Sequence, residues 1–169
     1  MRFLIIFIFL LTNSLADEAT DIKNLVINKE LKKYDGLTFL DAKNEQLNLN
    51  EYKGKLIILN FWATWCAPCK EEMPSLDLLQ SNNRLNNLKI FPINVGQENA
   101  EKAAKFFKSL KIQNLNLYFD SSVNLTKKFG LRGIPTSILF NKEGKEFGRI
   151  IGSINFQDEK FLNWLSKYN

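Results

Sequence analysis

The sequence contains no histidine and only two cysteines among its 169 residues. Without an imidazole, the chain cannot use Ser-His-Asp or Cys-His catalysis, a histidine-ligated zinc or copper site, or a histidine pH switch. Two cysteines are too few for a four-thiolate metal site or a disulfide-dense scaffold. Three roles are therefore left for the cysteines: a structural bridge, two inert thiols, or one redox pair.

The chain also lacks the charge segregation of a nucleic-acid-binding protein. Its net charge is +5, but the lysines are interleaved with acidic residues, as in the segment 142–146 (KEGKE). Such mixing is typical of a solvated surface, so we expect no nucleic-acid partner. Apolar residues make up 45% and charged residues 24% of the chain, which at this length predicts one globular domain.

Residues 1–16 have the pattern of an export signal. Arg2 provides a positive charge, residues 3–11 are an unbroken apolar run, and Ser14 and Ala16 are small residues at the cleavage-determining positions. An apolar run of this length spans only ~14 Å as a helix, about half of a bilayer core, which favours a cleaved signal peptide. A short uncleaved anchor is the alternative. Either way the domain is exported, which in a bacterium places it in the periplasm, where disulfides persist.

The rest of the sequence predicts an α/β fold. Residues 17–36 are polar and weakly periodic, which indicates an N-terminal extension with some helix. Near-continuous apolar runs predict buried strands, and apolar residues at spacings of three and four predict helices. The expected strands are 37–40, 46–49, 56–61, 88–95, 115–119, 134–140 and 146–151, and the expected helices are 68–80, 99–110, 122–129 and 158–168.

The order of these elements predicts the architecture. Strands and helices alternate first, and a hairpin followed by a helix comes last. This order favours a mixed central sheet with helices on both faces, in one domain over residues 37–169 that begins with a β-hairpin. Trp62 and the apolar stripe of Phe106, Phe107 and Leu110 are expected in the core.

Both cysteines lie in the segment Cys66-Ala67-Pro68-Cys69, between a predicted buried strand and a predicted helix. A helix N-terminus presents free N–H groups and a partial positive charge, which favour a thiolate. Pro68 fits the first turn because no N–H partner is needed there. We predict a redox pair in which Cys66 is the nucleophile and the deeper Cys69 resolves the mixed disulfide. A plain structural bridge and half of a zinc knuckle shared across a dimer are the alternatives.

The residues around this pair resemble the active site of the thioredoxin superfamily. The resemblance rests on the segment 61–70 (FWATWCAPCK), on Pro74, and on the segment 132–136 (RGIPT), which matches the superfamily's cis-proline loop. It covers about residues 37–168 and implies a thioredoxin-like fold.

The same resemblance implies a substrate-binding surface. The cis-proline loop lies beside the cysteines in the superfamily, and its backbone pairs with a substrate strand. Trp65 is expected to cover the disulfide and contact the substrate, while Thr64 is expected to make only local hydrogen bonds. The implied substrate-binding residues are Trp65, Ala67, Pro68, Gly133, Ile134 and Pro135.

Within the superfamily, the chain is most similar to the TlpA/ResA-like exported reductases. The N-terminal hairpin, the additional helix and strand between residues 99 and 119, and the segment 71–74 (EEMP) support this. In that group the glutamate at the position of Glu72 is implied to tune the cysteines and move protons. Cytosolic thioredoxins carry an aspartate where this chain has Asn60, which cannot ionise. A solvated glutamate favoured by the helix dipole is the alternative for Glu72.

These features predict a thiol-disulfide oxidoreductase that needs no metal and no cofactor beyond its cysteine pair. Strong oxidants and isomerases of the superfamily usually carry a histidine between the cysteines. Ala67 and Pro68 supply no such charge, which favours a reductase. The resemblance implies two partners for a monomeric protein: a client with a reducible disulfide, and a membrane thiol carrier of the DsbD or CcdA type as electron donor.

The expected clients belong to copper-site assembly in cytochrome oxidase or to cytochrome c biogenesis. The loop 133–137 (GIPTS) favours the former, because the cytochrome c branch typically carries Gly-Ala-Pro-Glu there. A copper chaperone and a non-catalytic client-binding module are the alternatives. The chain has neither the histidine ligand of a Sco-type chaperone nor the cysteine or proline loss expected of a binding module. A peroxidase would need its threonine three residues before the cysteine, whereas Thr64 lies two before Cys66.

Overall fold

The structure is a computed structural model that describes residues 21–120 and 122–169. The predicted signal peptide, residues 1–16, lies outside the described residues. The described chain folds around one eight-stranded sheet of order β1-β8-β7-β4-β5-β6-β2-β3. Its strands are β1 (Leu25–Lys32), β2 (Thr38–Asp41), β3 (Gln46–Asn48), β4 (Leu56–Trp62), β5 (Leu88–Asn94), β6 (Tyr118–Phe119), β7 (Thr136–Phe140) and β8 (Glu146–Ile151). Its helices are α2 (Ala67–Gln80), α3 (Ala100–Ser109), α4 (Asn124–Lys128) and α5 (Glu159–Ser166), with short 3-10 turns η1 (Leu49–Tyr52) and η2 (Asn83–Leu85).

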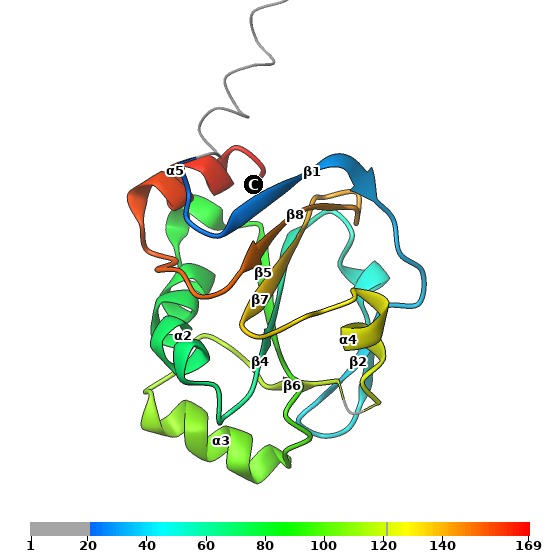
Figure 1. Cartoon of the computed structure of the whole chain (residues 1–169), viewed down its shortest axis with the longest axis vertical. Coiled ribbons are helices and arrows are strands. Elements are labelled where there is room, and N and C mark those ends of the chain that lie inside the picture. The colour runs from blue at the N-terminus through cyan, green and yellow to red at the C-terminus, as the bar shows by residue number, and fades with distance from the viewer. Residues whose placement is uncertain (1–20, 121) are drawn as a thin grey trace, which may run out of the picture.

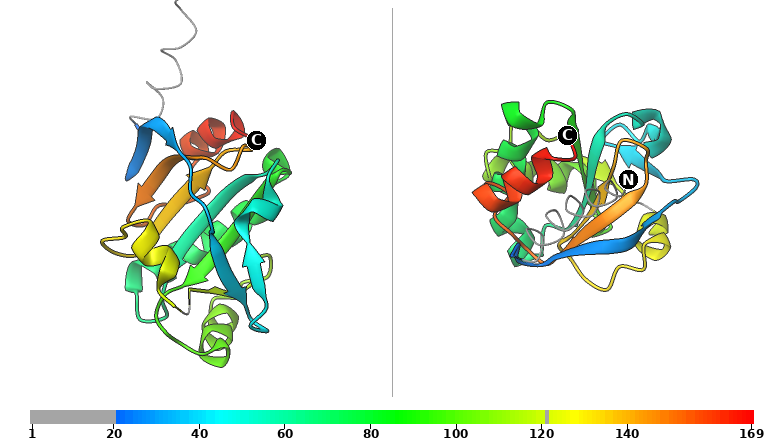
Figure 2. Two further views of the ribbon diagram at one scale, coloured as in Figure 1. Left: turned by 90° about the vertical axis from the view of Figure 1, so that its right-hand side faces the viewer. Right: turned by 90° about the horizontal axis from the view of Figure 1, so that it is seen from above.

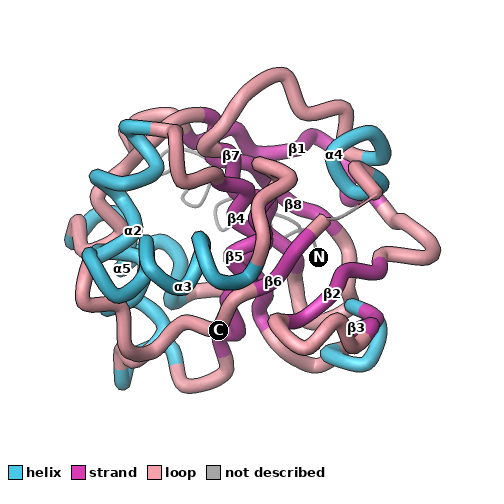
Figure 3. The backbone as a smooth tube through the Cα atoms, turned by 90° about the horizontal axis from the view of Figure 1, so that it is seen from below, coloured by secondary structure: helices cyan, strands magenta, loops and turns pink. Residues whose placement is uncertain are grey.

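The sheet is mixed, as predicted, because β4, β5 and β6 run parallel while the other neighbouring pairs are antiparallel. Side chains of the central strand β4 alternate between two apolar cores. One core also contains residues of α2, α3 and α5, and the other contains residues of α4 and η1. Figures 1 and 3 show the same division, with α2, α3 and α5 on one side of the sheet and α4 on the other. The prediction of helices on both faces is confirmed.

The segment before the hairpin differs from the prediction. The helix expected in this extension is wrong for its described part, residues 21–36, because Leu25–Lys32 form the edge strand β1, antiparallel to β8 (Figure 2). The buried carboxylate of Glu146 on β8 holds this segment, since it accepts hydrogen bonds from Asn28 Nδ2 at 2.9 Å and from the Tyr34 hydroxyl at 2.7 Å. Asn28 and Glu146 are 118 residues apart, so local periodicity does not report the pairing.

The strand expected over residues 115–119 is shorter, because only Tyr118–Phe119 join the sheet. Asp77 of α2 is 5% exposed, and its carboxylate binds backbone N–H groups at the first residue of the expected strand and just before it. It accepts those of Gln113, Asn114 and Leu115 at 2.7–3.2 Å. This contact also ties the segment after α3 to α2.

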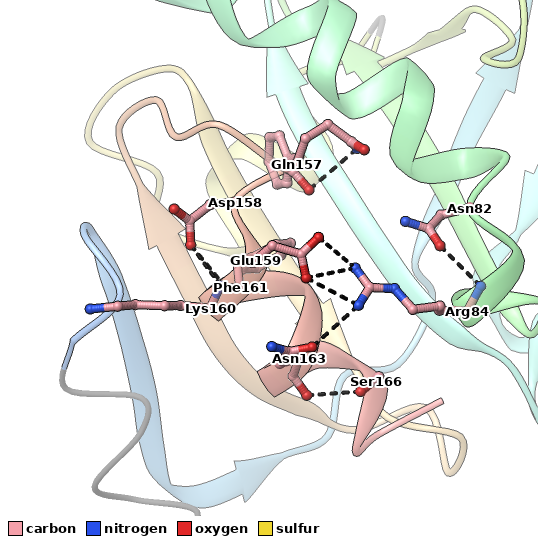
Figure 4. Close-up of polar contacts among 10 residues, drawn as sticks. Asn82, Arg84, Gln157, Asp158, Glu159, Lys160, Phe161, Asn163 and Ser166 are labelled. Atoms are coloured by element: carbon pink, nitrogen blue, oxygen red, sulfur yellow. Dashed lines mark hydrogen bonds and ion pairs between the residues drawn. The ribbon is translucent and has the colours of Figure 1, made fainter.

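Helix α5 closes the core that contains α2. Its first turn is capped by Asp158, whose side chain accepts the Lys160 N–H at 2.9 Å. Arg84 of η2 directs its guanidinium to Glu159 and Asn163 of α5, at 3.2 Å each (Figure 4). These side chains are exposed, so the ion pair adds little stability but marks where α5 meets the segment that follows α2.

Candidate active site

The cysteine pair lies where the chain passes from β4 into α2, with Cys66 just before the helix and Cys69 in its first turn. Cys66 and Cys69 form a disulfide, with their Cα atoms 5.3 Å apart. Cys66 is the N-cap residue of α2, and its Sγ accepts the Cys69 N–H at 3.3 Å. Cys66 is 5% exposed, whereas Cys69 is fully buried. A partner thiol or disulfide therefore reaches Cys66 more readily than Cys69.

The residues next to the cysteines form an exposed rim. Trp65 is 67% exposed, and Ala67 and Pro68 also face solvent. Trp62, in contrast, is fully buried and stacks on Phe106 with ring centroids 4.9 Å apart. The prediction that Trp62 belongs to the core is confirmed, and Trp65 is the tryptophan that a partner can touch.

The predicted cis-proline loop lies at the same end of the sheet. The Ile134–Pro135 peptide bond is cis, as the resemblance implied. Strand β7 begins immediately after this bond and runs antiparallel to β4, so that Thr136 lies opposite Phe61. The loop thus meets the chain just before the cysteines. Gly133 is exposed, Ile134 is half-buried and Pro135 is buried.

Glu72 lies one turn after Cys69, on the same face of α2. It is 3% exposed, so the alternative of a solvated glutamate is wrong. Its Oε1 accepts Asn60 Nδ2 at 2.8 Å and its Oε2 accepts the Ile154 N–H at 3.3 Å. Burial raises the pKa of Glu72 from 4.5 to about 7, and these two hydrogen bonds offset it only in part. A carboxyl with this pKa both accepts and releases a proton near neutrality.

A cavity of about 560 Å³ opens beside Glu72. Glu71 and Ser75 of α2 line one side, and Ser153, Ile154 and Asn155 after β8 line another. Glu72 itself contributes to the wall of this cavity.

Comparison with known proteins identifies the family. A model of the AhpC/TSA family matches residues 22–145. This chain belongs to the AhpC/TSA family. It is 32% identical over 122 residues to the thiol-disulfide oxidoreductase ResA of Geobacillus thermodenitrificans. The aligned region covers 71% of this chain and 68% of that relative. It is 30% identical over 105 residues to ResA of Halalkalibacterium halodurans. This second alignment covers 62% of this chain and 58% of the relative, which is less than two thirds of that relative's length.

The fold of this AhpC/TSA-family chain also has solved counterparts. The crystal structure of StoA from Bacillus subtilis superposes with a TM-score of 0.62 at 25% identity, over 85% of this chain and 98% of that one. The predicted thioredoxin-like fold is confirmed. With ResA relatives and a paired Cys66–Cys69, the chain is a thiol-disulfide oxidoreductase.

Glu98 is a residue near the site of this oxidoreductase that sequence reasoning missed. Its side chain is 4% exposed and accepts hydrogen bonds from Thr64 N at 3.0 Å, from the Thr64 hydroxyl, and from Asn94 Nδ2 at 2.9 Å. Lys102 forms an ion pair with it at 2.8 Å. Burial opposes its ionisation, but the hydrogen bonds from Lys102, Thr64 and Asn94 prevail and lower the pKa of Glu98 to about 2.

Glu98 thus contacts Thr64, which lies two residues before the predicted nucleophile Cys66. The prediction that Thr64 makes only local hydrogen bonds is wrong, because its backbone N–H and its hydroxyl both donate to Glu98, 34 residues away. Gly96 lets the carboxylate approach, because a Cβ there would lie 2.9 Å from Glu98 Oε2 and 3.0 Å from Ala63 Cβ. Gly96, four residues before the start of α3, is the one feature of the sequence that could have indicated this close contact.

Over residues 21–120 and 122–169, no three histidine, cysteine, aspartate or glutamate side chains gather closely enough to hold a metal ion. Within the same residues, none of the helices has the length and apolar character needed to cross a bilayer.

Proposed function

We propose that this oxidoreductase reduces client disulfides outside the cytoplasm. The observation that carries the proposal is Glu72, buried one turn from Cys69, with no cation among its hydrogen-bond partners in the described residues. Such a carboxyl serves as proton acceptor and donor for the resolving thiol. Because the chain has no histidine, no imidazolium stabilises the Cys66 thiolate, which favours a reducing couple.

The proposed reaction begins at the more accessible cysteine. The Cys66 thiolate attacks the client disulfide and forms a mixed disulfide, and the first client sulfur leaves as a thiolate that takes a proton from water. The Glu72 carboxylate accepts the Cys69 proton. The Cys69 thiolate then attacks Cys66 Sγ, and the second client thiolate leaves and receives the proton from Glu72. The client gains two electrons and two protons, and the cysteine pair is oxidised.

The client binds across the rim of the site. The exposure of Trp65 gives an apolar surface beside Cys66, and the cis-proline loop supplies backbone groups for an extended client segment. The residues proposed to contact the client are Trp65, Ala67, Pro68, Gly133, Ile134 and Pro135.

The compartment and partners are proposed from the sequence. Residues 1–16 would export the chain to the periplasm, where a monomer would receive electrons from a membrane thiol carrier of the DsbD or CcdA type. The clients would serve copper-site assembly in cytochrome oxidase or cytochrome c biogenesis. A Cys69→Ser variant expressed in its native compartment should accumulate the mixed disulfide, and identifying the trapped protein tests the client class.

The proton-carrier role is tested by Glu72→Gln against the neighbouring exposed Glu71→Gln as control. We expect Glu72→Gln to slow the second step about a hundredfold at pH 7 and to remove the inflection of its rate near that pH. Glu71→Gln should keep both the rate and the inflection. An unchanged pH profile in Glu72→Gln would reject the role.

The direction of the reaction is tested by the midpoint potential of the cysteine pair. We expect a value below about −200 mV, and a value near that of the strong periplasmic oxidant, about −120 mV, would reject the reductase. Tight stoichiometric binding of copper to the reduced protein would instead support the chaperone alternative.

A further inference from the structure

The partner of Glu72 on the sheet has an unusual hydrogen-bond pattern. Asn60 is fully buried in β4, where every residue is buried. Its Nδ2 donates to Glu72 Oε1 at 2.8 Å and to Ser137 Oγ at 3.0 Å. Its Oδ1 is buried and has no hydrogen-bond partner among the described residues. A buried acceptor without a partner is unfavourable and needs an explanation.

This pattern suits only the ionised form of Glu72. One carboxylate oxygen faces the Asn60 amide and the other faces the Ile154 N–H, and both of these groups are donors. A protonated Glu72 has a hydrogen to donate and meets no acceptor in this arrangement. The reaction proposed above nevertheless requires the protonated form in every cycle.

The other groups around Glu72 do not provide the missing acceptor. Ser137 on β7 contacts the Asn60 amide, and Ser75 on α2 donates its hydroxyl to the Glu72 backbone carbonyl. The charged groups that share the cavity with Glu72 come from the N-terminal segment, α2 and the start of α5. They are Asp21, Lys23, Glu71, Asp158 and Lys160. Among these groups, Asn60 Oδ1 is the buried acceptor that has no donor and belongs to a side chain already touching Glu72.

We propose that the Asn60 amide turns over when Glu72 takes up a proton, so that Asn60 is a positioning residue for the proton carrier. In the turned orientation, Oδ1 accepts the Glu72 O–H and the Ser137 hydroxyl. Ser137 thereby changes from acceptor to donor. The inference rests on the proton-carrier role of Glu72 proposed above.

The rotation is sterically simple. The amide oxygen and the NH₂ group are nearly the same size, and the terminal torsion of asparagine has two broad, roughly equivalent minima. One end of the amide is unpaired in each state: Oδ1 while Glu72 is ionised, and Nδ2 while it is neutral. Both protonation states of Glu72 therefore keep two hydrogen bonds around the Asn60 amide.

Asn94 in the adjacent strand β5 is a matched control. It is also buried, at 2% exposed, and its Nδ2 also donates to a glutamate, Glu98 Oε2, at 2.9 Å. Its Oδ1, however, accepts the Gly96 N–H at 3.0 Å. A backbone donor on Oδ1 holds this amide in one orientation, because turning it would bring two donors together.

The test is a pH titration of the full chain, monitored by NMR of the side-chain amides of Asn60 and Asn94. As pH falls through the titration of the Glu72 carboxyl carbon, we expect both Asn60 side-chain N–H protons to lose their acceptors and shift upfield, with the same midpoint. The Asn94 resonances should stay in place over this range. Asn60 resonances that keep their hydrogen-bonded positions while Glu72 titrates would overturn the proposal.

A variant separates this proposal from the role of Glu72 itself. In Glu72→Gln the group beside Asn60 no longer titrates, so the Asn60 amide resonances should become independent of pH near neutrality. Persistence of the shift in that variant would overturn the proposal. Failure of the amide to turn leaves the proton-carrier role standing, because that role is judged separately by the pH profile of the second chemical step.

Discussion

Among the described residues, two glutamates with buried side chains each accept a hydrogen bond from a buried asparagine on one of the neighbouring parallel strands β4 and β5, and their acidities differ greatly. Glu72 is paired with Asn60 of β4 and its pKa is raised to about 7. Glu98 is paired with Asn94 of β5 and its pKa is lowered to about 2. The same pair of residue types therefore gives a movable proton in one place and a fixed charge in the other.

The number and kind of donors explain the difference. Glu98 receives the N–H and hydroxyl of Thr64, the amide of Asn94, and an ammonium group from Lys102. Glu72 receives only an amide and one backbone N–H. Burial opposes ionisation of both, but only Glu98 has a cation and enough donors to overcome it. The two acids flank the cysteine pair: Glu98 holds the chain just before it and Glu72 follows it.

The largest expected effect is the difference in the free energy of unfolding between two variants in which Glu98 or Glu72 is replaced by leucine. Glu98→Leu leaves the partly buried donors of Thr64 and Asn94 without their acceptor, while the exposed Lys102 side chain stays solvated, so we expect the free energy of unfolding at pH 7 to fall by about 3 kcal/mol. Glu72→Leu removes a buried carboxyl that has no cation, and the change should stay within about 1 kcal/mol. Urea unfolding of the oxidised variants measures both. Equal losses would mean that the two sites are energetically alike.

The second effect is a pair of opposite pH dependences. Between pH 4.5 and about 7 the unfolded chain has lost the Glu72 proton while the folded chain retains it, so stability falls by about 3 kcal/mol as pH rises through this window. Glu98 acts in the other direction, and its contribution of about 3 kcal/mol is lost as pH falls from 4.5 through about 2.

Unfolding free energies measured across pH test this pair. Glu72→Gln should remove the decline between pH 4.5 and 7, and Glu98→Gln should reduce the decline below pH 4.5, where Glu146, whose pKa is also lowered, still contributes. A Glu72→Gln curve that runs parallel to the wild-type curve in the upper window would contradict the assignment.

The smallest effect concerns the cation. Lys102→Met should raise the pKa of Glu98 and lower stability by about 1 kcal/mol, because its ammonium group is 61% exposed and screened by solvent. Lys105→Met is the matched control on the same helix. Lys105 pairs with Glu101 at the same spacing, but both partners are exposed, so its loss should be close to zero. Similar losses in the two variants would show that burial of Glu98 does not matter.

The parts of the site that sequence reasoning anticipated are those encoded by short segments. The cysteine pair at a strand–helix junction, the cis bond before Pro135 and the position of Glu72 all lie within a few residues of recognisable patterns. The long, strongly apolar strand β4 and helix α2 were anticipated for the same reason. Their burial is a property of consecutive residues, so periodicity reports it.

The features that were not predicted from the sequence depend on contacts between residues far apart in the chain. Strand β1 is mostly exposed, so its sequence has little apolar pattern, and its existence depends on pairing with β8. Glu98 looks like an ordinary charge before a helix until Thr64, 34 residues earlier, folds against it. The unpaired Oδ1 of Asn60 is likewise defined only by packing. Contacts of this kind leave no local signal.

The segment between β5 and β6 acts as a brace for the redox helix. Glu98 fastens its beginning to the residue two before Cys66, and Asp77 fastens its end to the middle of α2 through three backbone amides. One carboxylate contact thus lies just before the helix with the cysteine pair, and the other lies in the middle of that helix. Deleting this segment to obtain a smaller thioredoxin-like domain would therefore also remove the two contacts that support helix α2.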